Sequence, residues 1–366
     1  MAEFNLPQRV LHGFAVCLAV LILLLICSGG LVTSHEAGMT VPDWPNSFGY
    51  NMFLFPISRW IGGVFFEHTH RLIASGVGML TIVLSVAAWV IERRRWVKWL
   101  TVAALGAVIV QGVLGGLRVT EHNALLGLFH GCLAQSYFCL VSVIALVTSS
   151  AWERLGANVG RASRPSAFAN SSDGRDARPT LLPTRLFYWA LVVTAMIFIQ
   201  LVLGASMRHS HAGLSIHDFP TVYGQWWPAV DSNALNAINV ARESQKEPDT
   251  TLGLIWLQYV HRLWAVAIVC ALAVTARRIL RTESAVPLLR ILAALWIGIV
   301  LAQFCLGIWT VWSNKAADVA TAHVALGATT LMIGVLISTI LGRLASITVP
   351  SGVLTGAGDR VPAASV

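Results

Sequence analysis

Long apolar runs alternate with short polar segments along this chain of 366 residues. Each run is about as long as the roughly 20 residues that a helix needs to cross a bilayer. The pattern predicts an all-α polytopic membrane protein with eight transmembrane helices. The predicted spans cover approximately residues 10–32, 68–91, 97–117, 124–148, 185–206, 254–276, 287–311 and 319–342.

The composition agrees with lipid as the solvent. Hydrophobic residues make up 56% of the chain and charged residues 11%, whereas a soluble domain carries about 25% charged residues. The net charge of +8 would also suit a nucleic-acid partner, but the basic residues form short clusters between apolar runs. Such clusters are typical of the cytoplasmic loops of membrane proteins. We therefore expect membrane lipid, and no nucleic acid, around this protein.

The basic clusters also predict the orientation. They lie between the second and third spans, between the fourth and fifth, and between the sixth and seventh. By the positive-inside rule both termini are cytoplasmic, and the long loops 33–67 and 207–253 face outward. No Arg/Ser-rich import presequence precedes the first run. The expected location is the plasma (inner) membrane of a bacterium, with multiple passes.

The second half of the chain repeats the first. Residues 37–45 match residues 212–220, and His70 and Arg71 match His261 and Arg262. Further matches join Gln111 to Gln303, Gly115 to Gly307 and His130 to His323. We predict two tandem four-helix bundles related by a pseudo-twofold axis along the membrane normal. The expected divisions are an N-terminal half (1–149), a cytoplasmic linker (150–184), a C-terminal half (185–344) and a tail (345–366).

Four of the eleven histidines lie within the spans, each within about two helical turns of the outward end. They are His70, His130, His261 and His323. An ionisable side chain at such depth is costly and indicates function. Two imidazoles on facing helices can supply both axial ligands of a heme iron. The pairs His70 with His130 and His261 with His323 are therefore candidate heme sites; the alternative for each histidine is a hydrogen bond to a neighbouring helix.

The other histidines lie in loops or at helix ends, where we expect structural roles. The sequence leaves open whether some of them bind metal: His35, His209, His211 and His217.

One substitution distinguishes the two halves. Glu67 lies one helical turn before His70, whereas the matching residue before His261 is Gln258. A carboxylate beside a heme can relay protons or stabilise a developing cation, and an amide cannot titrate. This difference predicts one reactive site and one holding site. Arg71 and Arg262 could pair with heme propionates or extend toward lipid headgroups.

Several of these segments together resemble the heme A synthase family. They are residues 30–33, 37–39, 43–44, 66–71, 111–116 and 130–131, together with His261, Arg262 and His323. The resemblance covers about residues 10–342. It implies a heme-dependent oxidoreductase that oxidises the C8 methyl of heme O to a formyl group, which gives heme A for terminal oxidases.

The resemblance also implies a role for each candidate residue. His261 and His323 would hold a resident heme b, His70 and His130 would flank the substrate heme O, and Glu67 would be the catalytic carboxylate. An electron donor, which the residues do not identify, is also implied. Further candidate partners are heme O synthase, the assembly of terminal oxidases and a second copy of this chain.

Two other classes of function remain open from the sequence. A diheme b-type membrane cytochrome would use both histidine pairs for permanent hemes and would need no carboxylate in one half alone. A heme transporter or chaperone would bind heme without changing it. An assay of the heme product separates both classes from an enzyme.

Overall fold

Eight long helices dominate the computed structural model, which describes residues 6–155, 182–228, 231–282 and 286–348. All eight are long and apolar enough to cross a membrane, so the predicted all-α fold with eight spans is confirmed. They are α1 (Leu6–Ser34), α2 (Gly63–Ile91), α3 (Arg95–Thr120), α4 (Ala124–Val147), α6 (Leu182–His209), α8 (Leu252–Arg281), α9 (Pro287–Trp312) and α10 (Ala317–Thr348).

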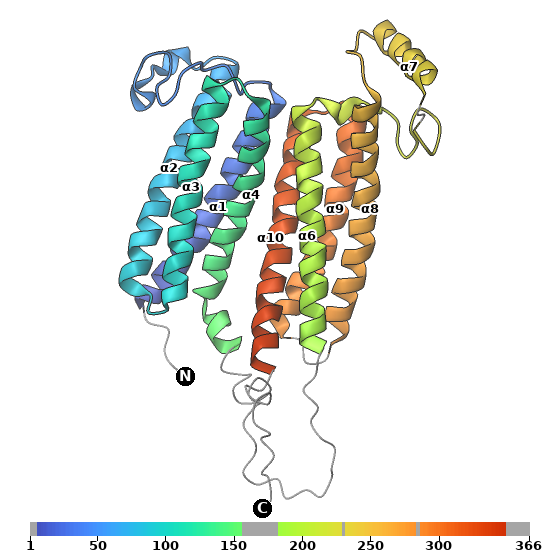
Figure 1. Ribbon diagram of the computed structural model, residues 1–366. Helices are drawn as coiled ribbons and strands as arrows, with labels where there is room; N and C mark the ends of the chain where they lie inside the picture. The colour runs from blue at the N-terminus through green and yellow to red at the C-terminus, as the bar shows by residue number, and fades with distance from the viewer. Residues whose placement is uncertain (1–5, 156–181, 229–230, 283–285, 349–366) are drawn as a thin grey trace, which may run out of the picture.

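The helices form two four-helix bundles that stand side by side (Figure 1). In the first bundle α1, α2, α3 and α4 pack as a ring, and in the second α6, α8, α9 and α10 do the same. The bundles meet through α4 and α10, which pack on each other and on α6 and α1 respectively. Over half of the apolar window of α4 and of α10 is buried (56%), against 17–33% in the other six helices. The two bundles therefore share α4 and α10 as their common centre.

Glycines allow the bundles to approach closely. A Cβ atom on Gly30 of α1 would lie 2.9 Å from Thr321 Cγ2 of α10, and one on Gly127 of α4 would lie 2.6 Å from His209 Cε1 of α6. Arg208 of α6 also donates hydrogen bonds to Gly30 O and to Ser34 Oγ of α1. Close packing and interhelical hydrogen bonds are the forces that join helices in lipid.

Two long loops cover the same end of the bundles, at the top of Figure 1. The α1–α2 loop (35–62) contains the 3₁₀ turns η1 (Met52–Leu54) and η2 (Ile57–Arg59), and the α6–α8 loop (210–251) contains η3 (Ala212–Leu214) and α7 (Ser232–Ser244). Each loop repeats one turn: Asp43 accepts hydrogen bonds from the backbone N–H groups of residues 48 and 49, and Asp218 from those of residues 223 and 224. The duplication therefore extends to the loops.

The helix α7 accounts for the main difference between the two loops. Matched positions are 175 residues apart at Asp43 and Asp218 but 191 residues apart at Glu67 and Gln258. The extra residues of the second half fall between these points, where α7 lies. This short polar helix, which Asp231 caps, was not predicted from the sequence.

The predicted linker and tail fall mainly outside the described residues. Residues 156–181 of the linker and 349–366 of the tail belong to this part of the chain. The domain boundaries at these places therefore stay predictions.

Candidate heme sites

The structure brings the four intramembrane histidines together as two pairs. His70 of α2 lies close enough to His130 of α4 for their charges to interact, and His261 of α8 lies equally within range of His323 of α10. Both pairs lie within a bundle, near the end that the loops cover. All four residues are half-buried. Each bundle thus presents two imidazoles from different helices at one level.

A glycine of a neighbouring helix packs against each histidine ring. A Cβ atom would lie 3.0 Å from His70 Cε1 if it were built on Gly29, and 3.2 Å from His130 Cε1 if it were built on Gly115. In the second bundle Gly204 and Gly307 take the same positions against His261 and His323, at 3.2 Å in both cases. Any larger residue would displace the rings, so these glycines fix where the imidazoles stand.

Glutamines contact three of the rings. In the first bundle His130 Nδ1 lies 3.2 Å from Gln111 O, and Gln111 Nε2 donates to His130 O. In the second bundle the Nε2 atoms of Gln200 and Gln303 lie 3.2 Å and 3.4 Å from the Nε2 atoms of His261 and His323. Gln200 has no polar counterpart in the first bundle, where Leu25 takes the matching position.

These residues fit a heme. The Nδ1 atoms of His70, His261 and His323 are buried without a hydrogen-bond partner among the described residues, although a buried polar atom normally has one. The contact of His130 Nδ1 with a backbone carbonyl is the arrangement that orients an imidazole whose Nε2 binds a metal. The donor set of two imidazoles per site suits the two axial positions of heme iron.

Glu67 and Gln258 occupy equivalent positions beneath the two loops. Glu67 is buried; its Oε2 accepts a hydrogen bond from Val41 N, and its Oε1 lies 2.6 Å from Arg71 Nη2. Gln258 is also buried and accepts a hydrogen bond from Ile216 N, the equivalent of Val41 N. Both side chains therefore fasten a loop to a helix, one with a charge and one without.

Arg71 and Arg262 hold the loops by their guanidinium groups. Arg71 donates to the backbone carbonyls of residues 41, 43 and 46, and Arg262 to those of residues 216, 218 and 221. These bonds use Nη1 and Nη2 of each arginine. The predicted pairing of these arginines with propionates stays a prediction, and the structure adds this anchoring role.

The two loop aspartates are held in the charged form. Partial burial would raise the pKa of Asp43 and of Asp218, but hydrogen bonds from the backbone N–H groups of each turn outweigh this effect. The pKa of both carboxyls is lowered. Both turns therefore keep their charge-assisted hydrogen bonds throughout the neutral range.

Arg118 of α3 was not singled out from the sequence. Its guanidinium packs between the α1–α2 loop and α4: a Cβ on Gly38 would lie 2.6 Å from its Nη2, and one on Gly127 would lie 3.0 Å from its Nε. It is within electrostatic range of both His70 and His130. Only the fold reveals this position, because Arg118 lies on a different helix from either histidine.

The remaining histidines have separate environments. His35 stacks on Phe66, His209 packs at Gly127, and His211 precedes η3 as its N-cap, with a left-handed backbone. His217 Nε2 lies 2.8 Å from Glu247 Oε2. Within the described ranges, no group of three or more His, Cys, Asp or Glu side chains is arranged to hold a metal ion.

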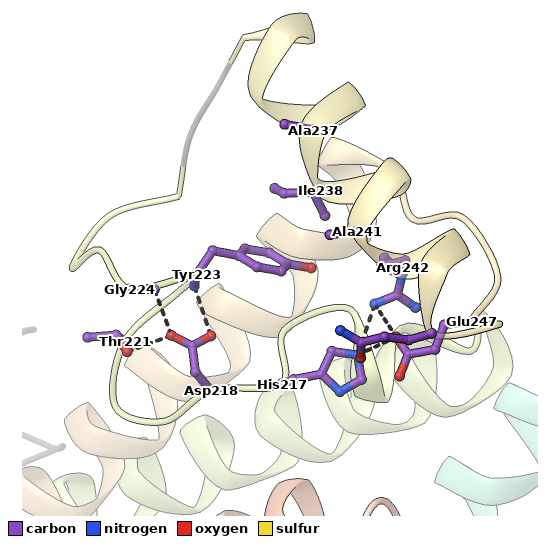
Figure 2. Close-up of a pocket in the computed structure, with 11 residues that line it drawn as sticks. His217, Asp218, Thr221, Tyr223, Gly224, Ala237, Ile238, Ala241, Arg242 and Glu247 are labelled. Atoms are coloured by element: carbon purple, nitrogen blue, oxygen red, sulfur yellow. Dashed lines mark hydrogen bonds and ion pairs between the residues drawn. The ribbon is translucent and has the colours of Figure 1, made fainter.

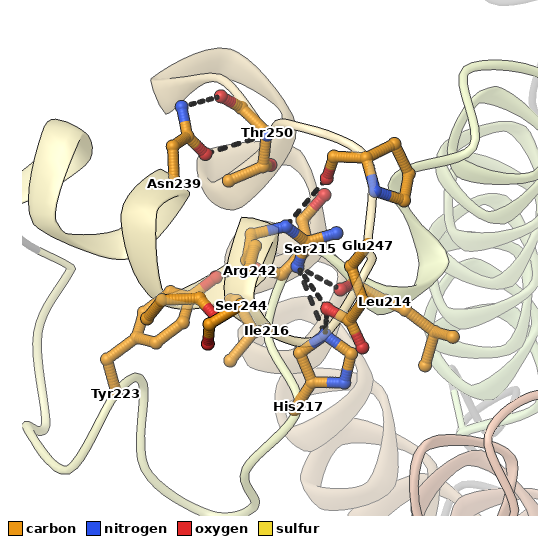
Figure 3. A network of polar contacts seen from close by, with 12 residues as sticks. Leu214, Ser215, Ile216, His217, Tyr223, Asn239, Arg242, Ser244, Glu247 and Thr250 are labelled. Carbon is orange, nitrogen blue, oxygen red and sulfur yellow. Dashed lines mark hydrogen bonds and ion pairs between the residues drawn. The ribbon is translucent and has the colours of Figure 1, made fainter.

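A separate hollow of about 630 Å³ lies between α7 and the turn at Asp218 (Figure 2). Its floor includes a polar network around the buried Arg242, which donates to Pro248 O and Leu214 O and contacts His217 and Glu247 (Figure 3). These bonds tie α7 to the rest of the loop. The network belongs to the cover of the second bundle and lies apart from the histidine pairs.

Two four-helix bundles, each with a half-buried pair of imidazoles, are an arrangement typical of membrane proteins that hold heme between their helices. The chain matches the COX15-CtaA family of cytochrome oxidase assembly proteins over residues 61–335. Since this match covers most of the chain, the protein belongs to that family.

Curated relatives agree with this assignment. A heme A synthase of Rhizorhabdus wittichii is 24% identical over 350 residues, which cover 86% of this chain and 89% of the relative. Heme A synthases of Shouchella clausii and Alkalihalophilus pseudofirmus are each 25% identical and cover 84% and 94% of this chain, with 99% of each relative matched.

The packing of His323 on Gly307 leads to a test. Gly307→Ala should displace the ring by a few tenths of an ångström, because the new Cβ would lie 3.2 Å from Cε1. We expect a shifted or weakened heme absorption spectrum in the purified variant. Gly298→Ala on the same helix is the matched control, since a Cβ there meets nothing within 4 Å. Identical spectra for the two variants would contradict this role of Gly307.

Proposed function

We propose that this protein is a heme A synthase, which oxidises the C8 methyl of heme O to a formyl group within the membrane. The observation that carries the proposal is a pair of equivalent bis-imidazole sites, of which only one has a carboxylate beside it. The family and the named relatives support it. The reaction comprises two monooxygenations at one carbon, each with O2 as the oxidant and two electrons from an external donor, followed by loss of water from the resulting gem-diol.

In this proposal the two bundles divide the work. The first bundle binds heme O between His70 and His130, and the second holds heme b between His261 and His323. The second pair has Gln258 in place of Glu67, and the absence of a titratable side chain at this position favours a holding site. Heme b, when bound, supplies one-electron redox chemistry.

Glu67 is the proposed catalytic carboxylate. Oxidation of a methyl beside the porphyrin builds positive character at that carbon, and dehydration of a diol requires a proton donor. Glu67 lies one turn from His70 and is linked to Arg71. This ion pair fixes the position of the carboxylate, which is the condition for acid–base or electrostatic catalysis.

We further propose that the two long loops face outward and that both termini and the linker are cytoplasmic. The support is the bias of Lys and Arg toward the opposite end. The histidine pairs then lie near the outer surface of a bacterial plasma membrane.

The resident heme can be tested by removing its ligands. His261→Ala and His323→Ala should each abolish or greatly weaken a low-spin bis-histidine spectrum in the purified protein, because one axial ligand is lost. His217→Ala, in the loop above, is the control and should keep the spectrum. An unchanged spectrum in both ligand variants would refute the assignment.

Glu67→Gln tests chemistry separately from structure. Gln258 holds the equivalent loop N–H group in the second bundle, so glutamine at position 67 should still accept from Val41 N. We expect the variant to retain heme b and bind heme O but to form heme A more slowly by about 10²–10⁴-fold, the usual loss when a positioned acid–base is removed. Chromatography of extracted hemes measures the product.

Gln258→Glu is the matched control for this variant, because it makes the reverse change in the second bundle, and we expect it to keep heme A formation. Heme A at normal levels in the Glu67→Gln variant would show that Glu67 serves only to anchor the loop. A diheme cytochrome or a heme carrier would form no heme A in any variant.

The orientation can be tested with single cysteines in a chain whose six native cysteines are replaced. A cysteine at Ser58 in the α1–α2 loop should react with an impermeant maleimide added to intact cells. A cysteine at Ser150 should react only after the membrane is opened. Labelling of position 150 from outside would overturn the topology.

A further inference from the structure

Arg118 is a cation without a counter-ion. Its guanidinium forms no hydrogen bond or ion pair within the part of the chain that the structure describes, and its Nε is buried without a partner. The nearest acid in electrostatic range is Glu67, but both oxygens of that carboxylate are already bonded, to Val41 N and Arg71. A half-buried arginine in a membrane span is costly unless something pairs with it.

The surroundings of Arg118 add positive charge. Arg208 and His209 of α6 lie within its electrostatic range, and Arg208 itself donates only to Gly30 O and Ser34 Oγ, which are neutral groups. Two arginines thus meet where the bundles join: Arg118 lies within electrostatic range of the first histidine pair, and Arg208 lies within range of His323 in the second. This combination favours an anion as the missing partner.

The second bundle is built differently at this place. The residue equivalent to Arg118 is Thr310, whose hydroxyl donates to Leu306 O of its own helix. A cation nevertheless lies beside the matching loop glycine. A Cβ atom on Gly213 would lie 3.2 Å from Lys315 Cδ. Lys315 is exposed and comes from the turn between α9 and α10. A cation therefore lies beside this loop glycine in both bundles, although the two cations come from positions that do not match in the duplication. Arg118 is half-buried, whereas Lys315 is exposed.

We propose that Arg118 binds a propionate of the substrate porphyrin in the first bundle. This inference rests on the proposed function, since it names the group that orients heme O. A propionate is a carboxylate, which a guanidinium binds through paired, charge-assisted hydrogen bonds. Arg71 has committed both of its terminal nitrogens to the loop, whereas Arg118 has all of its donors available.

The chemistry of heme O gives this contact a purpose. One of the two propionates is attached to the same pyrrole ring as the C8 methyl, so a bond to that propionate fixes the ring that reacts. Two axial histidines alone leave the porphyrin free to rotate about the axis through the iron. A third point of attachment removes this freedom, and orientation of this kind is a large part of catalysis.

Arg118→Thr, which copies the residue at position 310, tests the proposal. The purified full-length protein is titrated with heme O and with its dimethyl ester, in which both propionates are masked, and the absorption change gives each Kd. We expect Arg118→Thr to weaken binding of heme O by about 10-fold to 100-fold, since hydrogen bonds to charged groups are among the strong ones, and to leave the binding of the ester unchanged. Arg118→Lys should lose less, because it keeps the charge.

Two results would contradict the proposed role of Arg118. If Arg118→Thr binds heme O as the wild type does, Arg118 pairs with another anion, such as a lipid phosphate, and the proposal fails. It also fails if heme O and the ester are weakened equally, since Arg118 is then only a structural residue. The resident heme spectrum reports that each variant is folded. Heme A formation by the wild type is measured in the same preparations, so that a failure of the proposed function is recognised separately.

Discussion

Four imidazole rings pack closely against the backbones of neighbouring helices. This packing determines where the other side chains around each histidine pair lie. A polar ring in a lipid-embedded helix has to face the inside of its bundle. It fits there because a neighbouring helix presents glycine: Gly29 and Gly115 in the first bundle, Gly204 and Gly307 in the second. This packing fixes how each helix is rotated about its own axis, and it therefore fixes where residues one or two turns away project.

The loops depend on that rotation. With His70 directed into the bundle, Glu67 and Arg71, which lie one turn apart on a neighbouring face of α2, reach the α1–α2 loop and hold its backbone. The second bundle repeats the arrangement with Gln258 and Arg262. The loop over each histidine pair is consequently not an independent lid, because its fold is joined to the helix that carries one of the paired histidines.

The sequence predicted the spans and the pairing of histidines because hydropathy and a duplication are visible along the chain. The helices predicted from the sequence were too short. The apolar run of α8 ends near residue 276, but the helix continues to Arg281, because backbone hydrogen bonding does not stop where polar side chains begin. The helix α7 was missed because it is short and polar on average, although Leu235 and Ile238 on one of its faces pack against the apolar cluster around Ile255.

The parts of the site that escaped prediction depend on contacts between distant segments. Arg71 was expected to face propionates or lipid, and its bonds to the carbonyls of residues 41–46 follow from how the loop folds back. Gln200 of α6 contacts His261 of the neighbouring helix α8. Neither contact can be recognised from the spacing of residues along the chain. The sequence does show a difference between the halves, because the position that matches Gln200 is the apolar Leu25.

The replacements between the bundles have an electrical consequence. Glu67 and Arg118 carry opposite charges and lie within range of one another, whereas the matching residues Gln258 and Thr310 carry none. The first bundle thus has a dipole formed by these two side chains, which its copy lacks, although Arg262 and Lys315 still bring positive charge to the second bundle. A built-in field stabilises charge separation as it develops without any rearrangement of the surroundings. The substitutions at these two positions therefore leave the bundles alike in how helix backbones pack on the histidine rings and different in the electrostatic environment of the two pairs.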